Sequence, residues 1–110
     1  MLAVPREPFL NAPRDIRDRI ELIIGDSATI DLSHLNSQMG LVLVDAGHSY
    51  DACLRDSALA MKLVRPGGIV LWDDYGDYWP GVKAAVETLA ETLHLSHVRR
   101  ENYIVYRAAA

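Results

Sequence analysis

Acidic residues close three apolar runs of this sequence, and they are the residues best placed to do chemistry. The runs and the acids that follow them are Ile20–Ile24 with Asp26, Leu41–Val44 with Asp45, and Ile69–Trp72 with Asp73 and Asp74. If the runs are parallel strands, their carboxyl ends share one edge of a sheet, where open α/β sheets bind ligands. Clustered carboxylates repel one another unless a cation compensates, and Mg²⁺ prefers such oxygen ligands.

The same acids also fit a purely structural interpretation. An Asp at the end of a strand often caps the next helix or begins a turn, and the Asp-Asp-Tyr-Gly sequence at 73–76 has favourable turn chemistry. The spacing of the acids alone leaves a metal site and a set of ordinary turns both open.

The elements that would position these acids are visible in the hydrophobic pattern. Apolar residues are continuous rather than alternating in Leu41–Val44 and Ile69–Trp72, which predicts strands covered on both faces. Ser49 is suited to cap a helix that runs to about Val64 and turns Ala52, Leu59 and Leu63 toward the core. The Pro-Gly-Gly sequence at 66–68 predicts the turn after that helix.

Further elements are predicted on both sides of this unit. Before it we expect an irregular lead-in at 1–13, a short charged helix to Arg19, a strand at Ile20–Ile24 and a short helix from Thr29 to Gln38. After it, Pro80 begins a helix with an apolar stripe of Val82, Val86, Leu89 and Leu93. The segments 95–98 and 103–106 predict a β-hairpin. This alternation predicts an α/β fold in a single domain of residues 1–110.

The composition weighs against several classes of protein. A net charge of −4 argues against nucleic-acid binding, which needs a surplus of Lys and Arg on one face. Cys53 is the only cysteine, so the chain has no intrachain disulfide and no zinc pattern. No apolar run approaches the ~18 residues of a membrane helix. We therefore expect a cytoplasmic protein without nucleic-acid or membrane partners.

One segment carries a resemblance to a known family. It reads VDAGHSYDACLRDSALAMKLVRPGGIVLWDDY and combines an Asp-x-x-His strand end, a Pro-Gly-Gly turn and an Asp-Asp strand end. In these features the chain resembles the C-terminal half of class I methyltransferases that use S-adenosylmethionine (SAM), of the type that methylates small-molecule oxygens. The resemblance implies a truncated, partial Rossmann-like methyltransferase sheet, mainly parallel, with an antiparallel C-terminal hairpin.

The resemblance also implies roles for single residues at the strand ends. Asp45, Asp73 and Asp74 match the acids that hold Mg²⁺ in metal-dependent relatives, and His48 falls where such relatives carry a base. A neutral imidazole is suited to removing a hydroxyl proton. His48 equally fits a residue that orders the turn by bonding to a neighbouring Asp.

Contacts to the cofactor and the methyl acceptor follow in the same way. Asp26 and Ser27 resemble the family's turn near the adenine of SAM, and an ordinary strand-end turn explains them equally. Tyr75, Tyr78 and Trp79 are candidates for an acceptor pocket or, alternatively, for packing before the next helix.

The family's glycine-rich loop is missing from this sequence, since no glycines form a Gly-x-Gly loop after a strand. The family's first two strands, which would lie between Ile20–Ile24 and Leu41–Val44, are missing with it. Their loss would leave Leu41–Val44 with an open apolar edge, which tends to pair with another strand. Either Ile20–Ile24 closes up beside it or a second chain does, and we expect a homo-oligomer, most simply a two-fold dimer.

Two functional hypotheses result. The first is SAM-dependent methyl transfer to a small-molecule oxygen, completed by a partner or a longer chain. The alternative is a truncated methyltransferase fold without catalysis that acts as a self-associating or ligand- or metal-binding module.

Overall fold

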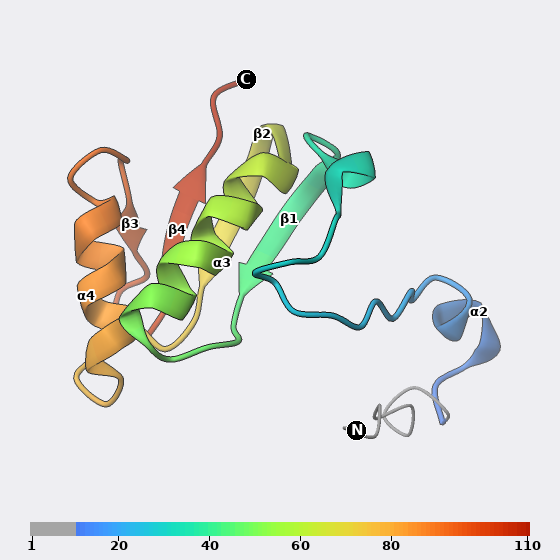
Figure 1. The fold of residues 1–110 in the computed structure, drawn as a ribbon, viewed down its shortest axis with the longest axis horizontal. Helices are drawn as coiled ribbons and strands as arrows, with labels where there is room; N and C mark the ends of the chain where they lie inside the picture. The colour runs from blue at the N-terminus through green and yellow to red at the C-terminus, as the bar shows by residue number, and fades with distance from the viewer. Residues whose placement is uncertain (1–10) are drawn as a thin grey trace.

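The computed structural model describes residues 11–110, and its centre is a four-stranded sheet (Figure 1). The strands are β1 (Met39–Val44), β2 (Val64–Trp72), β3 (Ser96–His97) and β4 (Ile104–Arg107), in the order β1-β2-β4-β3. The first pair is parallel, whereas β4 runs antiparallel to both β2 and β3. The predicted α/β class, with its C-terminal hairpin, is confirmed. The predicted lead-in lies outside the described residues except for 11–13.

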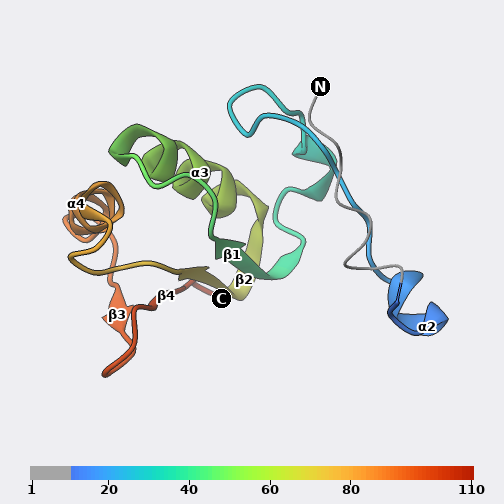
Figure 2. The same ribbon diagram turned by 90° about the horizontal axis from the view of Figure 1, so that it is seen from below.

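Two helices cover one face of this sheet. Leu41 and Leu43, which alternate with Val42 and Val44, are exposed, so the prediction that Leu41–Val44 is covered on both faces was wrong. Helix α3 (Tyr50–Leu63) and helix α4 (Pro80–Leu89) lie side by side in a single layer (Figure 2). Helix α3 connects β1 to β2, and helix α4 lies between β2 and β3 in the chain. The fold is therefore a two-layer unit with its core between the helices and the sheet. None of the helices in the described residues is long and apolar enough to cross a membrane.

Helix α3 begins where the sequence predicts. The Ser49 hydroxyl accepts a hydrogen bond from the backbone N–H of Ala52 at 3.1 Å, which caps the first turn. The buried side chains of the helix recur every three or four residues and are Cys53, Ser57, Ala60 and Leu63. Leu63 is buried as predicted, whereas Ala52 and Leu59 are only half-buried.

The core is organised around Trp72, which is fully buried. Its indole Nε1–H donates to the hydroxyl of buried Ser57 at 2.8 Å, and that hydroxyl donates to the Cys53 carbonyl at 2.6 Å. A polar chain of this kind satisfies the one buried indole donor, so the bulky ring can fill the core without an unpaired N–H.

The Pro-Gly-Gly segment lies inside β2 rather than in a separate turn. Met39 is opposite Val64 and Leu41 is opposite Ile69, so residues 65–68 bulge out of the ladder. Gly67 has a φ of 76°, a left-handed conformation that glycine adopts without steric cost. The bulge lets the chain leave α3 and enter the sheet without a long loop.

The segment Ile20–Ile24 is not a strand, so this prediction was wrong. No other described residue pairs with it, and the β-branched pattern cannot form a ladder without a partner strand. The segment belongs to an arm, residues 11–30, which projects from the body and carries the four-residue helix α2 (Arg14–Arg17) (Figure 1).

The helix predicted over Thr29–Gln38 is also wrong, because only a short 3₁₀ turn, η1 (Ser33–Leu35), forms there. The Asp31 carboxylate accepts the backbone N–H of Ser33 at 3.0 Å and so competes with a regular helix. Hydrogen bonding from the Ser33 side chain, together with this bond from its backbone N–H, holds the pKa of Asp31 below its ordinary value.

Helix α4 follows the predicted stripe but ends before its last member. Val82 and Val86 are buried and Leu89 packs against the core. The helix stops at Leu89, and Leu93 therefore lies beyond it, in a turn. The predicted hairpin is confirmed, with Ser96 opposite Val105 across β3 and β4.

Candidate functional site

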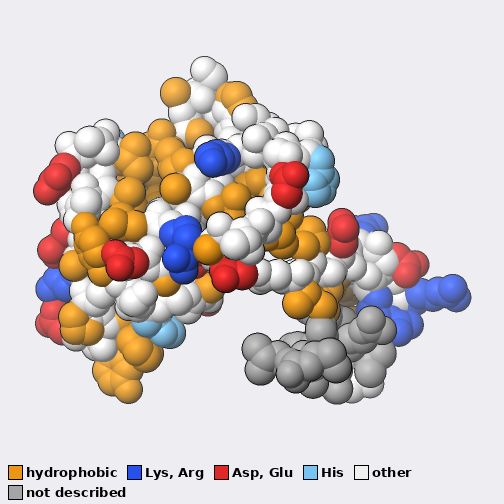
Figure 3. Space-filling model, viewed as in Figure 1, with side chains coloured by type: hydrophobic (Ala, Val, Ile, Leu, Met, Phe, Trp, Pro, Cys, Tyr) orange, Lys and Arg blue, Asp and Glu red, His pale blue; other side chains and the backbone are white. Residues whose placement is uncertain are grey.

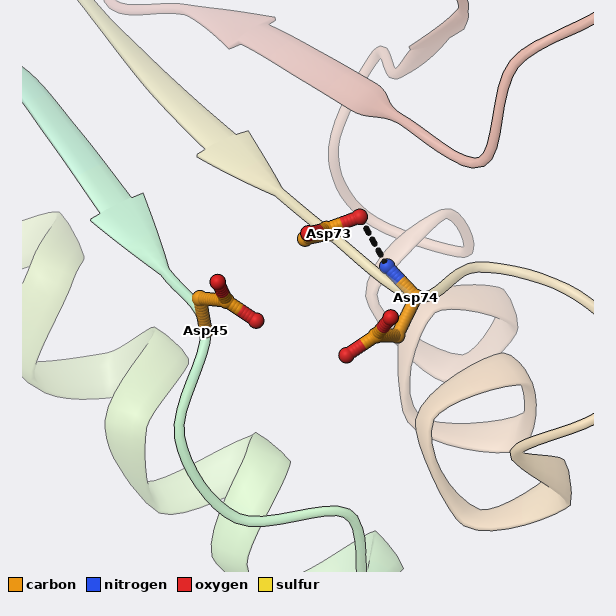
Figure 4. A group of neighbouring side chains, drawn as sticks. All are labelled: Asp45, Asp73 and Asp74. Atoms are coloured by element: carbon orange, nitrogen blue, oxygen red, sulfur yellow. Dashed lines mark hydrogen bonds between the residues drawn. The ribbon is translucent and has the colours of Figure 1, made fainter.

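Three acids meet at the carboxyl end of the parallel strand pair. Asp45 follows β1, and Asp73 and Asp74 follow β2, which the register places alongside it because Val44 lies opposite Trp72. One carboxylate oxygen of each acid lies within 4.8 Å of the others (Figure 4). The strand ends thus gather these carboxylates as the sequence predicts.

The two adjacent acids are held by local backbone geometry. Asp74 has a φ of 66°, and its N–H donates to Oδ1 of Asp73 at 2.7 Å. The N–H of Asp73 still donates to the carbonyl of Val44 at 3.3 Å, which extends the sheet by one bond. Asp tolerates this left-handed conformation better than most residues. One oxygen of Asp73 thus faces the Asp74 N–H, and the Asp74 carboxylate is directed toward Asp45 (Figure 4).

His48 joins the acid cluster from the loop before α3. Its Nε2–H donates to Oδ2 of Asp74 at 2.9 Å, because a carboxylate can only accept. The imidazole also stacks on the Trp79 ring, with centroids 3.7 Å apart and planes 9° from parallel. His48 is thus oriented by two neighbours, which suits both an ordered turn and a positioned base.

A close backbone approach fixes this stack. A Cβ added to Gly81 in the first turn of α4 would lie 2.5 Å from the His48 carbonyl and 2.8 Å from the Tyr50 nitrogen. Only glycine allows the helix to approach the loop so closely. The start of α4, and with it Trp79, is thereby pressed against the loop that carries His48.

The charges in the cluster act on Asp45 most clearly. Partial desolvation, together with the negative charges of Asp73 and Asp74, raises the pKa of the Asp45 carboxyl, while His48 opposes the shift. Among the described residues no Lys or Arg pairs with the three acids. The cluster therefore carries uncompensated negative charge, which a bound cation would relieve.

The donor set fits a hard divalent cation. Asp73 uses one carboxylate oxygen for the Asp74 N–H, and Asp74 uses one for His48, so each keeps a second oxygen for a metal. Three carboxylates with solvent at the remaining positions match the all-oxygen coordination that Mg²⁺ prefers. Asp45, Asp73 and Asp74 are the residues that would hold it.

Asp26 lies outside the acid cluster, whereas Ser27 lines a groove that Asp45 also lines. Asp26 does not end a strand, and its Oδ1 accepts the N–H of Ala28 at 2.8 Å within its own turn. It is absent from the acid group that the described residues form. Ser27, in contrast, is half-buried and lines a groove of about 220 Å³ beside Asp45.

The three aromatic residues near the site divide between packing and exposure. Trp79 packs on His48, and Tyr75 packs edge-on against His97 with centroids 5.3 Å apart. Tyr78 contacts Trp79 edge-on but is 84% exposed. Packing thus accounts for Tyr75 and Trp79, whereas Tyr78 is largely exposed next to Trp79.

Comparison with known families agrees with this architecture. Residues 5–75, more than half of the chain, match the model of a methyltransferase-domain family. The chain belongs to this family. Methyltransferase domains in general take their methyl group from SAM. No curated protein matches the chain significantly.

Two features of the site escaped the sequence prediction. The stack of Trp79 on His48 depends on the close approach at Gly81, and the Pro-Gly pair that begins α4 was its only signal. The second is Asp56 on α3, which lines the same groove as Ser27 and has a buried Oδ1 without a partner in the described residues. Its signal was an acid next to the buried stripe of the helix.

Proposed function

We propose that this chain supplies the metal- and acceptor-binding part of a SAM-dependent methyltransferase that acts on a small-molecule oxygen. The observation that carries the proposal is the meeting of Asp45, Asp73 and Asp74 at one strand edge in a chain of the methyltransferase family. Mg²⁺ bound to these acids would lower the pKa of an acceptor hydroxyl and hold it in place.

His48 is proposed to accept the proton of that hydroxyl. Its Nε2–H is engaged with Asp74, so in the neutral imidazole Nδ1 is the nitrogen left with a free lone pair. The stack on Trp79 restricts rotation of the ring. A base that is already oriented loses little freedom when the acceptor binds, which favours proton transfer.

The residues present fit only part of a SAM site. Ser27 lines the groove beside Asp45 and is proposed to contact the cofactor, and Asp26 is proposed to act through the backbone of its turn. The sequence contains no glycine-rich loop to cradle the rest of the cofactor. Those contacts are proposed to come from a second chain or a longer polypeptide.

Calorimetric titration of SAM into the chain, with and without Mg²⁺, tests the proposal. Binding of micromolar or better affinity supports it, and a screen of hydroxyl acceptors with labelled SAM would then identify the substrate. The Asp73→Asn variant is the control, because it keeps an oxygen for the Asp74 N–H but weakens the metal site. No heat at millimolar SAM would contradict catalysis by this chain alone.

The alternative is a non-catalytic module that keeps the fold for self-association or for binding a ligand or metal. The missing glycine-rich loop and the exposed edge of β1 favour it. Mg²⁺ binding without any SAM binding is the result that distinguishes this alternative from the enzyme.

A further inference from the structure

Strand β1 forms one edge of the sheet and has no partner on its outer side among residues 11–110. Leu41 and Leu43 on this strand are 62% and 52% exposed. An exposed, apolar edge with free backbone groups is a template for another strand. The groove of about 220 Å³ runs along this strand, because consecutive residues of β1, Val42–Val44, line it.

The groove combines an apolar lining with two acids. Residues of β1 and α3, together with Ser27 and Ala46, line it, and its only charged side chains among the described residues are Asp45 and Asp56. Oδ1 of Asp56 is buried and accepts no hydrogen bond within the described part of the chain. A buried acceptor without a donor is costly, so the groove favours an occupant that is apolar and ends in a strong donor.

The arm of the same chain has these properties. Ile20–Ile24 contains no Pro or Gly, and its exposed side chains include Leu22 at 44% and Ile24 at 64%. Its only backbone hydrogen bond within 11–110 is from the Ile20 N–H to the Arg17 carbonyl. Just before it stand exposed arginines that make no ion pair with described residues, and Figure 3 shows basic side chains with acidic ones among them toward the tip of the arm.

We propose that Ile20–Ile24 of a second copy pairs with β1 in antiparallel orientation and places its Arg19 at the acidic end of the groove. Two copies that exchange this segment form a closed two-fold dimer. In the register argued below, the Arg19 guanidinium lies opposite Asp45 and would pair with that carboxylate.

Charge selects the antiparallel orientation, and the side-chain pattern is compatible with it. Parallel pairing would bring Asp26 of the partner chain next to Asp45, adding another acid to the cluster. Antiparallel pairing with Ile20 opposite Val44 instead puts Arg19 opposite Asp45. In that register the even-numbered residues of the arm segment face α3 together with Val42 and Val44, so apolar side chains fill the groove.

Sedimentation velocity of the whole chain, in EDTA to exclude metal effects, tests this dimer. The wild type is expected to dimerise at micromolar concentration, and Arg19→Asp or Asp45→Arg alone should weaken dimerisation roughly tenfold or more. The double variant, in which the charges are exchanged, should recover most of the loss. Arg99→Asp, a reversal in the exposed β3–β4 turn, should leave the dimer unchanged.

A second pair of variants tests the strand pairing without changing charge. Adjacent N–H groups in a strand point to opposite sides, so one of the N–H groups of Leu22 and Ile23 must face β1. Proline has no N–H, so one of the two variants, Leu22→Pro or Ile23→Pro, removes a hydrogen bond between the strands, and that variant should abolish the dimer. Neither N–H bonds to any residue in 11–110, so circular dichroism should show an intact fold. A wild type that stays monomeric, or a dimer indifferent to all these variants, would overturn the proposal.

Discussion

Two apolar runs of similar composition have opposite fates in this molecule. Ile69–Trp72 lies between two strands and under α3, and both Val70 and Trp72 are fully buried. Ile20–Ile24 has the same β-branched character, yet all four of its hydrophobic side chains are exposed.

The difference lies in the partners rather than in the runs themselves. Ile69–Trp72 finds β1, β4 and α3 within its own chain, whereas no described residue offers Ile20–Ile24 a ladder or a face to cover. Strand propensity measures how well a residue fits a half-buried surface, and it forms nothing where that surface is missing. The packed body and the arm can therefore be compared directly by mutation.

The largest expected effect is in the body. Trp72→Ala should lower the free energy of unfolding by about 3–5 kcal/mol, because it removes a fully buried indole and leaves a cavity. Ile24→Ala in the arm should change it by less than about 0.5 kcal/mol. Urea unfolding followed by circular dichroism measures both. Equal losses would show that the arm is packed as firmly as the sheet.

The next effect concerns the polar chain beneath the sheet. Ser57→Ala leaves the buried Trp72 N–H without an acceptor and should cost about 1–3 kcal/mol of unfolding free energy. In a Trp72→Phe background the same substitution should cost clearly less, since no indole N–H is left unpaired. The same cost in both backgrounds would exclude the hydrogen bond as the cause.

A smaller effect is expected where the body meets the site. Gly81→Ala gains about 0.5–1 kcal/mol of helix propensity. The added methyl would, however, overlap backbone atoms of the His48–Tyr50 loop, which costs about 1–3 kcal/mol. We expect net destabilisation and a changed Trp79 fluorescence. Gly76→Ala is the control, because its Cβ would meet only the Asn102 side chain, at 3.4 Å.

The smallest effect belongs to an exposed ion pair. Lys83 donates to Asp77 at 2.7 Å, and this hydrogen bond lowers the pKa of Asp77 from 3.8. The ion pair therefore stabilises the fold at pH values above 3.8, and this stabilisation is lost as the pH falls through the lowered pKa of Asp77. Solvent screens it, so Asp77→Asn should scarcely move the urea midpoint at neutral pH. A large shift would contradict this weak role.

Sequence reasoning succeeded where a pattern depends on local contacts. The Ser49 cap, the start of α3 and the apolar strands that end in Asp45 and Asp73 follow from spacing and capping rules, whereas of the core residues predicted for α3 only Leu63 is buried. Because the two strands are parallel, the meeting of their acids followed from topology alone.

The failures arose where the outcome depends on something outside the segment. Ile20–Ile24 lacked a partner strand, and the Asp31 side chain diverted the backbone of the helix expected after it. The stack of Trp79 on His48 depends on how closely α4 approaches a distant loop. Distances between elements of this kind are set by packing, which no single run of sequence encodes.

Asp45, Asp73 and Asp74 are proposed to form the metal site of a methyltransferase, and calorimetric titration of Mg²⁺ is the sharpest test of this proposal. We predict saturable binding at one site per chain, weakened at least about tenfold by Asp73→Asn, since one of three charged ligands becomes neutral. Asp77→Asn, which removes an acid outside the cluster, should leave the affinity unchanged. No binding at millimolar Mg²⁺, or equal weakening by both variants, would contradict the claim.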